Sequence, residues 1–268
     1  MKIIRHLTSS GPAYAALQPD GSALEIAGDL FGAFRLTERS VKPGKILAPI
    51  VPTNILAIGL NYKKHAEEGG KGLPERPMLF IKSTNTLQNP GDPIELPRKL
   101  VSHEVDYECE LAVVIGKTCK NATRANALDY VLGYTAANDV SARDWQVRLN
   151  GGQFCQGKSF DTFCPLGPAL VTKDEISNPN SLRIQTILNG QTMQDCSTAD
   201  MVFDVPTIIE FLSGSKTLKP GTVILTGTPH GVGFARKPPV FLKAGDTVTI
   251  ELEKVGSLTN PVIEEVLG

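Results

Sequence analysis

The sequence predicts a strand-rich α+β protein whose main body is a mixed β-roll or barrel with a small N-terminal appendage. Short strand-like runs recur along the 268 residues, and 25 glycines and 19 prolines separate them. Helical patterns are few. This combination favours a β-dominated roll or barrel over a doubly wound parallel sheet, in which helices alternate with strands.

The first part of the chain reads as a small N-terminal domain, residues 1–48. Strand-like runs are followed by a turn at Asp20-Gly21 and a break at Lys42-Pro43-Gly44, and the runs cover Lys2–Arg5, Ala13–Leu17 and Ala23–Ile26. A larger domain, residues 49–268, is expected to follow.

The larger domain opens with a buried strand and continues as a series of strands. The expected strands are ILAIGL (55–60), MLFIK (78–82), TVILTG (222–227) and DTVTIELE (246–253). Asn189-Gly190 lies between two strand-like runs and predicts a hairpin. Helices are expected at Thr123–Leu132, at Ser141–Leu149 and at Asp204–Leu212, with Asp204 as the N-cap of the last.

Composition excludes several classes of partner. The formal net charge is -1 and the isoelectric point is near 6.4, so no basic surface for nucleic acid or an anionic membrane is expected. The five cysteines form no CxxC pair, which fits a reducing compartment better than a disulfide framework. No apolar run approaches a membrane span, and no signal peptide is apparent. A cytoplasmic protein is expected, with the mitochondrial matrix as the alternative.

Acidic residues alternate with apolar ones in EVDYECELAVVIG (104–116), which predicts a strand with Asp106, Glu108 and Glu110 on one face. Neighbours on that face lie about 7 Å apart, and two unit charges at that distance repel by roughly 2–2.5 kcal/mol at an effective dielectric constant of 20. A hard divalent cation would relieve this repulsion. An exposed acidic edge is the alternative.

GLNYKKHAEEGG (59–70) predicts a short helix capped by Asn61. His65 and Glu68 are three residues apart and would share one face of this helix. The pattern fits a general base oriented by a carboxylate, beside a hinge at Gly69-Gly70. A surface helix with an incidental Glu–His contact is the alternative.

Two further segments end strands with polar groups. In AANDVSARDWQ (136–146), Asp139 and Arg143 would lie a turn apart where a strand ends, either as site residues or as a buried structural pair. In TVILTGTPHGVG (222–233), the N–H groups of the glycine loop and the Thr228 hydroxyl are suited to an anion, unless the glycines serve only a tight turn.

GQFCQGKS (152–159) matches the phosphate-binding P-loop pattern, but its context argues against that function. No buried strand precedes the motif, and Pro165 and Pro168 fall where the phosphate-binding helix would run. Lys158 is therefore expected to face some other anion.

Taken together, five segments resemble the fumarylacetoacetate hydrolase family, most closely its domain-containing type 2 branch. The match spans roughly residues 50–262, and the segments are NYKKH, YECELAVVIGK, AANDVSARDWQ, GKSFDTFCPLGP and VILTGTPHGVG. The resemblance implies a mixed β-roll catalytic domain, a homodimer and a Mg²⁺ or Mn²⁺ site. It implies that the metal ligands are Glu108, Glu110 and Asp139, that the catalytic residues are His65, Glu68 and Lys158, and that substrate is held by Arg143, Gln146, Lys158 and Thr228.

Two positions depart from this pattern or stand outside it. Longer members of the family carry a further carboxylate ligand ahead of the histidine, where this chain has AIGLN, so water would fill that coordination position. Asp106 matches no ligand of the family and is expected to be solvated.

The residues that the resemblance implies suit a small 2-oxo acid, whose two adjacent oxygens chelate a six-coordinate cation and whose enolate is thereby stabilised. Hydrolytic C–C cleavage of an acylpyruvate is the first expectation, with His65 activating water. Keto–enol tautomerisation or decarboxylation of oxaloacetate on the same site is the second. A non-catalytic dimeric module that binds a metabolite is the third. The identity of the 2-oxo acid does not follow from the sequence.

Overall fold

The computed structural model describes residues 1–267, and strands dominate it as predicted. Its nineteen strands are β1 Lys2–Thr8, β2 Gly11–Leu17, β3 Ala23–Gly28, β4 Phe34–Val41, β5 Ile46–Leu47, β6 Asn54–Gly59, β7 Met78–Lys82, β8 Leu87–Gln88, β9 Ile94–Leu96, β10 Val105–Asp106, β11 Cys109–Ile115, β12 Val131–Asn138, β13 Ser141–Ala142, β14 Cys164–Thr172, β15 Arg183–Leu188, β16 Gln191–Ser197, β17 Thr222–Leu225, β18 Thr247–Leu252 and β19 Gly256–Glu264.

The helices are short. The α-helices are α1 Lys63–Glu68, α2 Phe154–Lys158 and α3 Val205–Ser213, a π-helical turn covers Trp145–Leu149, and single 3₁₀ turns cover Thr84–Thr86, Ala127–Tyr130, Pro179–Ser181, Thr198–Asp200 and Gly233–Ala235. Helix α3 matches its predicted bounds, and the Asp204 side chain accepts the backbone N–H of Thr207 as an N-cap.

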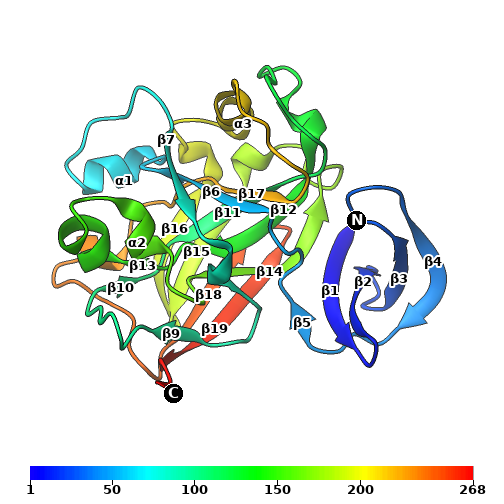
Figure 1. Ribbon diagram of the computed structural model, residues 1–268, viewed down its shortest axis with the longest axis horizontal. Coiled ribbons are helices and arrows are strands. Elements are labelled where there is room, and N and C mark those ends of the chain that lie inside the picture. Colours follow the sequence, from blue (N-terminus) through cyan, green and yellow to red (C-terminus); the bar gives the residue numbers. More distant parts are fainter. Residues whose placement is uncertain (268) are drawn as a thin grey trace.

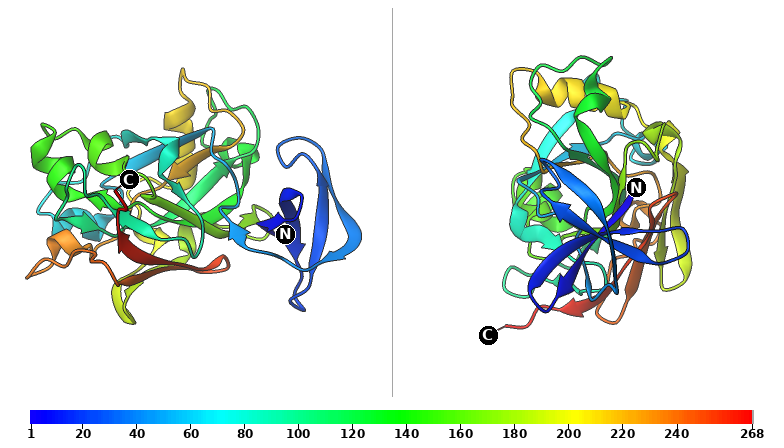
Figure 2. Two further views of the ribbon diagram at one scale, coloured as in Figure 1. Left: turned by 60° about the horizontal axis from the view of Figure 1, so that its bottom comes forward. Right: turned by 90° about the vertical axis from the view of Figure 1, so that its right-hand side faces the viewer.

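The strands form two open sheets and a two-stranded ribbon rather than a closed barrel. The large sheet runs in the order β4-β3-β2-β1-β14-β12-β11-β17-β6-β7, with β5 beside β1 and β8 beside β14. The second sheet has the order β16-β15-β18-β19-β9, and β10 pairs with β13. Figure 1 shows β1–β4 gathered at one side of the larger body, and the right-hand view of Figure 2 shows them in front of it. The N-terminal strands join the body through the pairing of β1 with β14.

Strand β11 is buried on both faces and divides the core. Leu111 and Val113 pack into one apolar cluster, which also contains Ile184 and Ile250 of the second sheet. Ala112 and Val114 point the other way, into a second cluster on the opposite side of the large sheet. Because Glu110 precedes Ala112 by two residues, its carboxylate emerges on the side of that second cluster.

The expected helix Thr123–Leu132 is wrong. The segment makes one 3₁₀ turn and then enters β12, which lies between β11 and β14. Gly133 explains part of this outcome, because a Cβ there would lie 2.3 Å from the carbonyl oxygen of Val171. Close strand pairing outweighs the local helical pattern.

The second expected helix, Ser141–Leu149, is only partly correct. Its first two residues form β13, and the rest forms the π-helical turn. The hairpin at Asn189-Gly190 is confirmed: both residues have positive φ, 50° and 81°, as the tight turn between β15 and β16 requires.

Candidate active site

Three carboxylates meet at the start of β11. One oxygen or more from each of Glu108, Glu110 and Asp139 lies within 4.8 Å of the others, and all three residues are buried. Strand β11 supplies Glu110, and Asp139 follows the end of β12, the neighbouring strand. The pairing of Glu110 with Ala137 brings these strand ends together.

Asp106 is not part of this carboxylate group. The prediction that Asp106, Glu108 and Glu110 lie on one face of a single strand is therefore wrong for Asp106. The strand is interrupted at Tyr107 and Glu108, where the backbone N–H of Glu108 donates to the Asn138 side chain. Asp106 instead belongs to β10, and it is fully buried rather than solvated.

Two lysines lie among the carboxylates. Lys158 Nζ lies 2.6 Å from Glu108 Oε2 and 2.7 Å from Asp139 Oδ2. Lys82 Nζ lies 2.6 Å from Asp139 Oδ1. Both lysines are only 1% exposed. The anions that Lys158 contacts in this structure are carboxylates of the chain itself, so its expected contact with another anion stays a prediction.

Arg143 links Glu108 to Asp106. Its Nη1 lies 2.7 Å from Glu108 Oε1 and donates to Gln146 Oε1 at 3.0 Å. Its Nε donates to Asp106 Oδ2 at 2.9 Å. Nη2 lies 2.8 Å from the same oxygen without hydrogen-bond alignment, which leaves donor capacity on that nitrogen. The suggested Asp139–Arg143 pair does not form, because the two side chains have these other partners. We call these residues the charged centre: Lys82, Asp106, Glu108, Glu110, Asp139, Arg143 and Lys158.

The two glutamates of the charged centre differ in electrostatics. Burial opposes ionisation of Glu108, yet Lys158 and Arg143 lower its pKa to about 2. Burial, together with the negative charges of Asp139 and Glu108, raises the pKa of Glu110 well above its usual value. Glu110 has one hydrogen-bond donor among the described residues, the N–H of Gly227 at 2.6 Å. Its negative charge is therefore poorly compensated.

His65 and Glu68 lie on α1 as predicted. His65 Nδ1 is 3.1 Å from Glu68 Oε2, and the second carboxylate oxygen accepts the N–H of Gly231 at 2.9 Å. Burial alone would raise the pKa of Glu68, but these two contacts lower it. Because a carboxylate at Nδ1 favours a hydrogen on that nitrogen, Nε2 is left as the proton acceptor.

Asn61 is not the cap of α1, contrary to the prediction. It is fully buried, and its amide donates to the carbonyl oxygens of Phe203 and Thr226. The residue before the helix is Tyr62, which makes no side-chain cap. Asn61 therefore anchors the chain that enters α1 rather than the helix N-terminus itself.

The glycine loop after β17 binds anions, but they are carboxylates of the chain. Gly227 donates to Glu110, Gly231 to Glu68 and Gly233 to Asp106. The Thr228 hydroxyl accepts a hydrogen bond from Gln194 at 2.9 Å. The expectation that these N–H groups cradle an external anion is corrected: they position Glu68 and Glu110, which line one pocket, and Asp106, which lies outside its lining.

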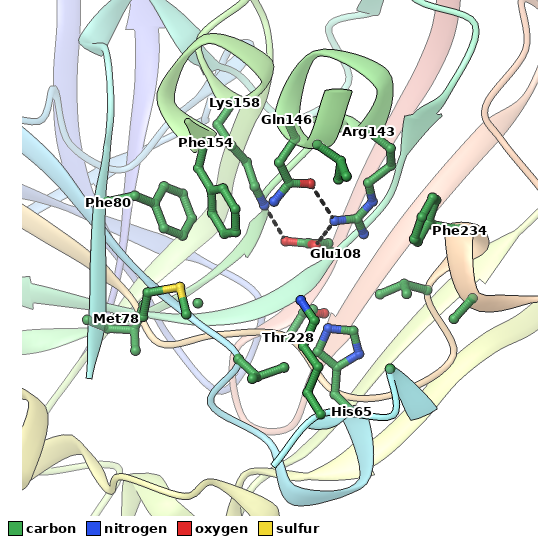
Figure 3. A pocket seen from close by; sticks show the side chains of 18 of the residues that line it. His65, Met78, Phe80, Glu108, Arg143, Gln146, Phe154, Lys158, Thr228 and Phe234 are labelled. Atoms are coloured by element: carbon green, nitrogen blue, oxygen red, sulfur yellow. Dashed lines mark hydrogen bonds and ion pairs between the residues drawn. The ribbon is translucent and has the colours of Figure 1, made fainter. Parts of the chain in front are cut away.

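This pocket has a volume of about 430 Å³. Eight of the nine predicted site residues line it: His65, Glu68, Glu108, Glu110, Arg143, Gln146, Lys158 and Thr228. Asp139 lies behind them, beneath the two lysines. Figure 3 shows His65 across Glu108 from Lys158 and Gln146, with Phe80 and Phe154 to one side and Phe234 to the other.

The sequence analysis missed two features of the charged centre. It did not identify Lys82, and it expected Asp106 to be solvated rather than buried beside Arg143. Lys82 ends the apolar run MLFIK, and strand alternation places it on the same face as Met78 and Phe80. A lysine at the inner end of an apolar strand is the signal that was available. For Asp106 the signal was weaker, because its partners lie 37 and 127 residues away in sequence.

The P-loop-like segment behaves as its context predicted. It contains the five-residue helix α2, which follows a π-helical turn rather than a strand. Lys158 at the end of α2 turns into the charged centre.

Comparison with known families decides the relationship. The family described as "Fumarylacetoacetate (FAA) hydrolase C-terminal" matches residues 54–263. The chain belongs to this family. A second family, described as "Rv2993c-like, N-terminal", matches residues 1–49.

Curated relatives lie on the type 2 branch of the fumarylacetoacetate hydrolase family. The chain is 52% identical over 219 residues to "Oxaloacetate tautomerase fahd2, mitochondrial" of Xenopus laevis, covering 81% of this chain and 68% of that protein. It is 49% identical over 218 residues to "Oxaloacetate tautomerase FAHD2A, mitochondrial" of Homo sapiens, covering 81% and 69%.

A solved structure of a similar protein covers almost the whole chain. It is described as 5-carboxymethyl-2-hydroxymuconate delta-isomerase from Mycobacterium smegmatis, with 40% identity, a TM-score of 0.86, and coverage of 99% of this chain and 100% of that one. The chain is thus an enzyme-family member with relatives named as tautomerases and isomerases. No helix within residues 1–267 is long and apolar enough to cross a membrane.

The residues of the charged centre fit the divalent cation on which the fumarylacetoacetate hydrolase family generally depends. Four carboxylates face three cationic side chains, so one negative charge is uncompensated when all are ionised. Each carboxylate oxygen has two acceptor positions, so oxygens already bound to Lys158 or Arg143 retain one for a metal. Glu110 carries the least compensated charge and offers the freest oxygens.

Proposed function

We propose that this chain is a divalent-metal-dependent enzyme that interconverts the enol and keto forms of a small 2-oxo acid of the oxaloacetate type. The observation that carries the proposal is the His65–Glu68 pair, which faces a buried carboxylate–lysine centre in one pocket. The names of the curated relatives support this reaction over the hydrolysis that the sequence placed first.

Glu108, Glu110 and Asp139 would hold Mg²⁺ or Mn²⁺, since hard cations take oxygen ligands. The cation would act as a Lewis acid on the substrate oxygens and stabilise negative charge that develops on them. It would also turn the net charge of the centre from negative to positive. A positive centre would attract an anionic 2-oxo acid, whereas the centre without the cation would repel it.

The substrate carboxylate would be bound by Arg143 and Gln146. Both residues line the pocket, and the Gln146 amide nitrogen is free of the contact that its oxygen makes with Arg143. Because Asp106 holds the guanidinium through Nε, with the buried Nη2 beside the same oxygen, the orientation of Arg143 is set before substrate arrives. Thr228 lines the same pocket and would contribute its hydroxyl.

Proton transfer would be carried out by His65. Ketonisation moves one proton to C3 and removes one from the enol oxygen, so it needs a group that takes and returns protons near neutral pH. Glu68 orients the imidazole, and the Lys158 ammonium would stabilise negative charge on the C2 oxygen while the proton moves. Loss of CO₂ from C3 of oxaloacetate would leave the enolate of pyruvate, which a proton delivered to C3 converts to pyruvate, so decarboxylation remains a reaction available to these groups.

Hydrolytic C–C cleavage of an acylpyruvate is the second candidate. The observation in its favour is the partial exposure of the His65 side chain, 18%, at a pocket that opens to solvent. A water held by His65 against a second carbonyl would give cleavage in place of proton transfer.

One pair of assays separates the candidates. Loss of enol-oxaloacetate is followed by ultraviolet absorbance, and acetylpyruvate is incubated separately with the enzyme in ¹⁸O-water. We expect rapid ketonisation and no cleavage of any acylpyruvate. Labelled acetate appearing together with pyruvate would instead establish the hydrolase, and no turnover of either substrate would support a binding module.

A further inference from the structure

One end of the pocket is apolar and lies next to Lys158. We call it the aromatic end and define it by Gly59, Met78, Phe80 and Phe154. The rings of Phe80 and Phe154 meet edge to face, with centroids 5.7 Å apart and an interplanar angle of 67°. Lys158 Nζ lies 5.1 Å from the centroid of the Phe80 ring, so the aromatic end begins where the charged centre ends.

One face of strand β7 runs from the solvent-exposed rim of the pocket to the buried charged centre. Met78, Phe80 and Lys82 alternate onto one face, and their exposed fractions fall from 43% to 8% to 1%. Lys82 reaches Asp139, whereas Phe80 and Met78 line the pocket farther out. Figure 3 shows the side chains of Met78, Phe80 and Phe154 on the same side of the pocket.

Gly59 keeps space open between these side chains. It pairs with Met78, and a Cβ on it would lie 3.3 Å from Met78 Sδ and 3.6 Å from Phe154 Cε2. Gly59 is not among the glycines with positive φ, so the backbone conformation does not require glycine here. What a larger residue would remove is therefore room inside the pocket.

The size and polarity of this space do not suit a four-carbon diacid alone. A cavity of about 430 Å³ lies in the range of roughly 300–1,000 Å³ that holds drug-sized ligands. The four residues that define the aromatic end carry no charge. Lys158 beside them donates two of its three N–H groups to Glu108 and Asp139, and the proposed function uses the third for the C2 oxygen. A second substrate carboxylate directed there would lose water without gaining a cation, whereas an apolar group would be favoured.

We propose that the aromatic end is a subsite for an apolar substituent on C3 of the substrate, so that the pocket takes 3-aryl and 3-alkyl 2-oxo acids. This proposal rests on the proposed function for the placement of the 2-oxo acid group at the charged centre. Phe80 and Phe154 then contact the substituent, and Gly59 admits it between Met78 and Phe154. These residues determine specificity, whereas the charged centre and His65 serve every substrate alike.

Phenylpyruvate and pyruvate are the matched probes, because they differ only by the phenyl group on C3. Binding of each is measured by calorimetry with Mg²⁺ present, and ketonisation of enol-phenylpyruvate is followed by ultraviolet absorbance. Two variants test the subsite. Gly59→Val fills the space, and Phe154→Ala removes one side of it. Ile81→Ala is the control, since Ile81 lies on β7 between two residues of the pocket face but points away and is 52% exposed.

We expect wild-type protein to bind phenylpyruvate at least about tenfold more tightly than pyruvate, as apolar contacts of this size typically give. Both variants should reduce that ratio to near one, and Ile81→Ala should keep the wild-type ratio and change oxaloacetate ketonisation less than about threefold. Equal affinities in wild type, or a preference that survives both substitutions, would overturn the subsite. Tight phenylpyruvate binding that depends on Gly59 and Phe154, without ketonisation of either phenylpyruvate or oxaloacetate, would keep the subsite and refute the proposed reaction instead.

Discussion

The charged centre and the His65–Glu68 pair face each other across one pocket but are held in different ways. Residues of the charged centre come from strands, strand ends and the last residue of α2, and they are nearly inaccessible. Most of them contact more than one partner. His65 and Glu68 lie on a six-residue helix, and their side chains are 18% and 21% exposed. The groups that we propose to bind substrate are thus fixed before it arrives, whereas the pair that we propose to transfer the proton depends on a few contacts.

Those contacts are specific. Near its start, α1 receives support from Asp200, which accepts the N–H of Lys64 at 3.1 Å. At its end, Glu68 accepts the N–H of Gly231. The difference between the regions predicts that substitutions in the charged centre change binding and stability, whereas substitutions in the pair change mainly the rate.

The largest effect is expected from Glu110→Ala. Because Glu110 is the least compensated acid of the centre, its removal should abolish binding of about one equivalent of Mg²⁺ or Mn²⁺ per chain and reduce turnover to the uncatalysed level. Calorimetry and elemental analysis measure the metal, and Glu38→Ala on exposed β4 is the control. Normal metal affinity in the Glu110→Ala protein, or full wild-type activity in excess chelator, would contradict the site.

His65→Ala tests the other side of the comparison. Removal of a positioned general base typically costs ~10²–10⁴ in rate, so kcat should fall in that range while metal affinity and the free energy of unfolding stay near wild type. Steady-state kinetics, calorimetry and urea unfolding provide the three measurements. A decrease of less than about threefold would make His65 an ordinary surface residue, and loss of metal would make it a ligand.

Asp106→Asn should act through stability and positioning. Breaking one side of a buried ion pair typically costs about 3–5 kcal/mol, and Arg143 would lose the carboxylate that holds its Nε. We expect a lower urea midpoint and a higher KM with a smaller change in kcat. The matched control is Asp195→Asn, whose Arg183 partner is on the surface and whose loss should change little. Unchanged stability would mean that Asp106 is dispensable.

A smaller effect is expected from Glu68→Gln. Glutamine keeps one acceptor oxygen, for either His65 or the N–H of Gly231 but not for both, and it removes the charge. The value of kcat should therefore fall by about tenfold, the difference between a charged and a neutral hydrogen bond. Glu67→Gln, on the exposed side of the same helix, should be silent. An effect as large as that of His65→Ala would show that Glu68 itself reacts.

No effect at all is expected from nucleotides. Lys158 is buried between Glu108 and Asp139, and no strand leads into its helix. Calorimetry with ATP and GTP should show no binding, whereas Lys158→Met should lose turnover of the 2-oxo acid. Because Lys158 is buried, that variant is also expected to be less stable than wild type. Micromolar nucleotide binding would overturn this reading of the motif.

The sequence revealed those parts of the molecule that local patterns encode. Alternating side chains predicted the strands, Asn189-Gly190 predicted its hairpin, and the spacing of His65 and Glu68 predicted their contact. Glu108 and Glu110 were found together because they are two residues apart, one just before β11 and one at its start.

Contacts between distant segments were beyond these patterns. Lys82 and Asp139 are 57 residues apart, and no pattern in either segment indicates that the two residues are in contact. The break that separates Asp106 from Glu108 depends on Asn138 of the neighbouring strand. For the same reason the helix expected at Thr123–Leu132 is wrong, since pairing with two other strands decides its conformation.

Strand β7 lies at the edge of the large sheet, hydrogen-bonded to β6 alone in the strand order. Its register, from Ile55 opposite Lys82 to Gly59 opposite Met78, is therefore set by one neighbour. A slip of one residue would turn Leu79 and Ile81 inward and carry the Lys82 ammonium to the outer face. A single residue inserted within this strand would thus remove a counter-ion of Asp139 and also change the side chains that line the pocket. An insertion in the preceding segment 70–77 would leave the pairing of β7 with β6 intact.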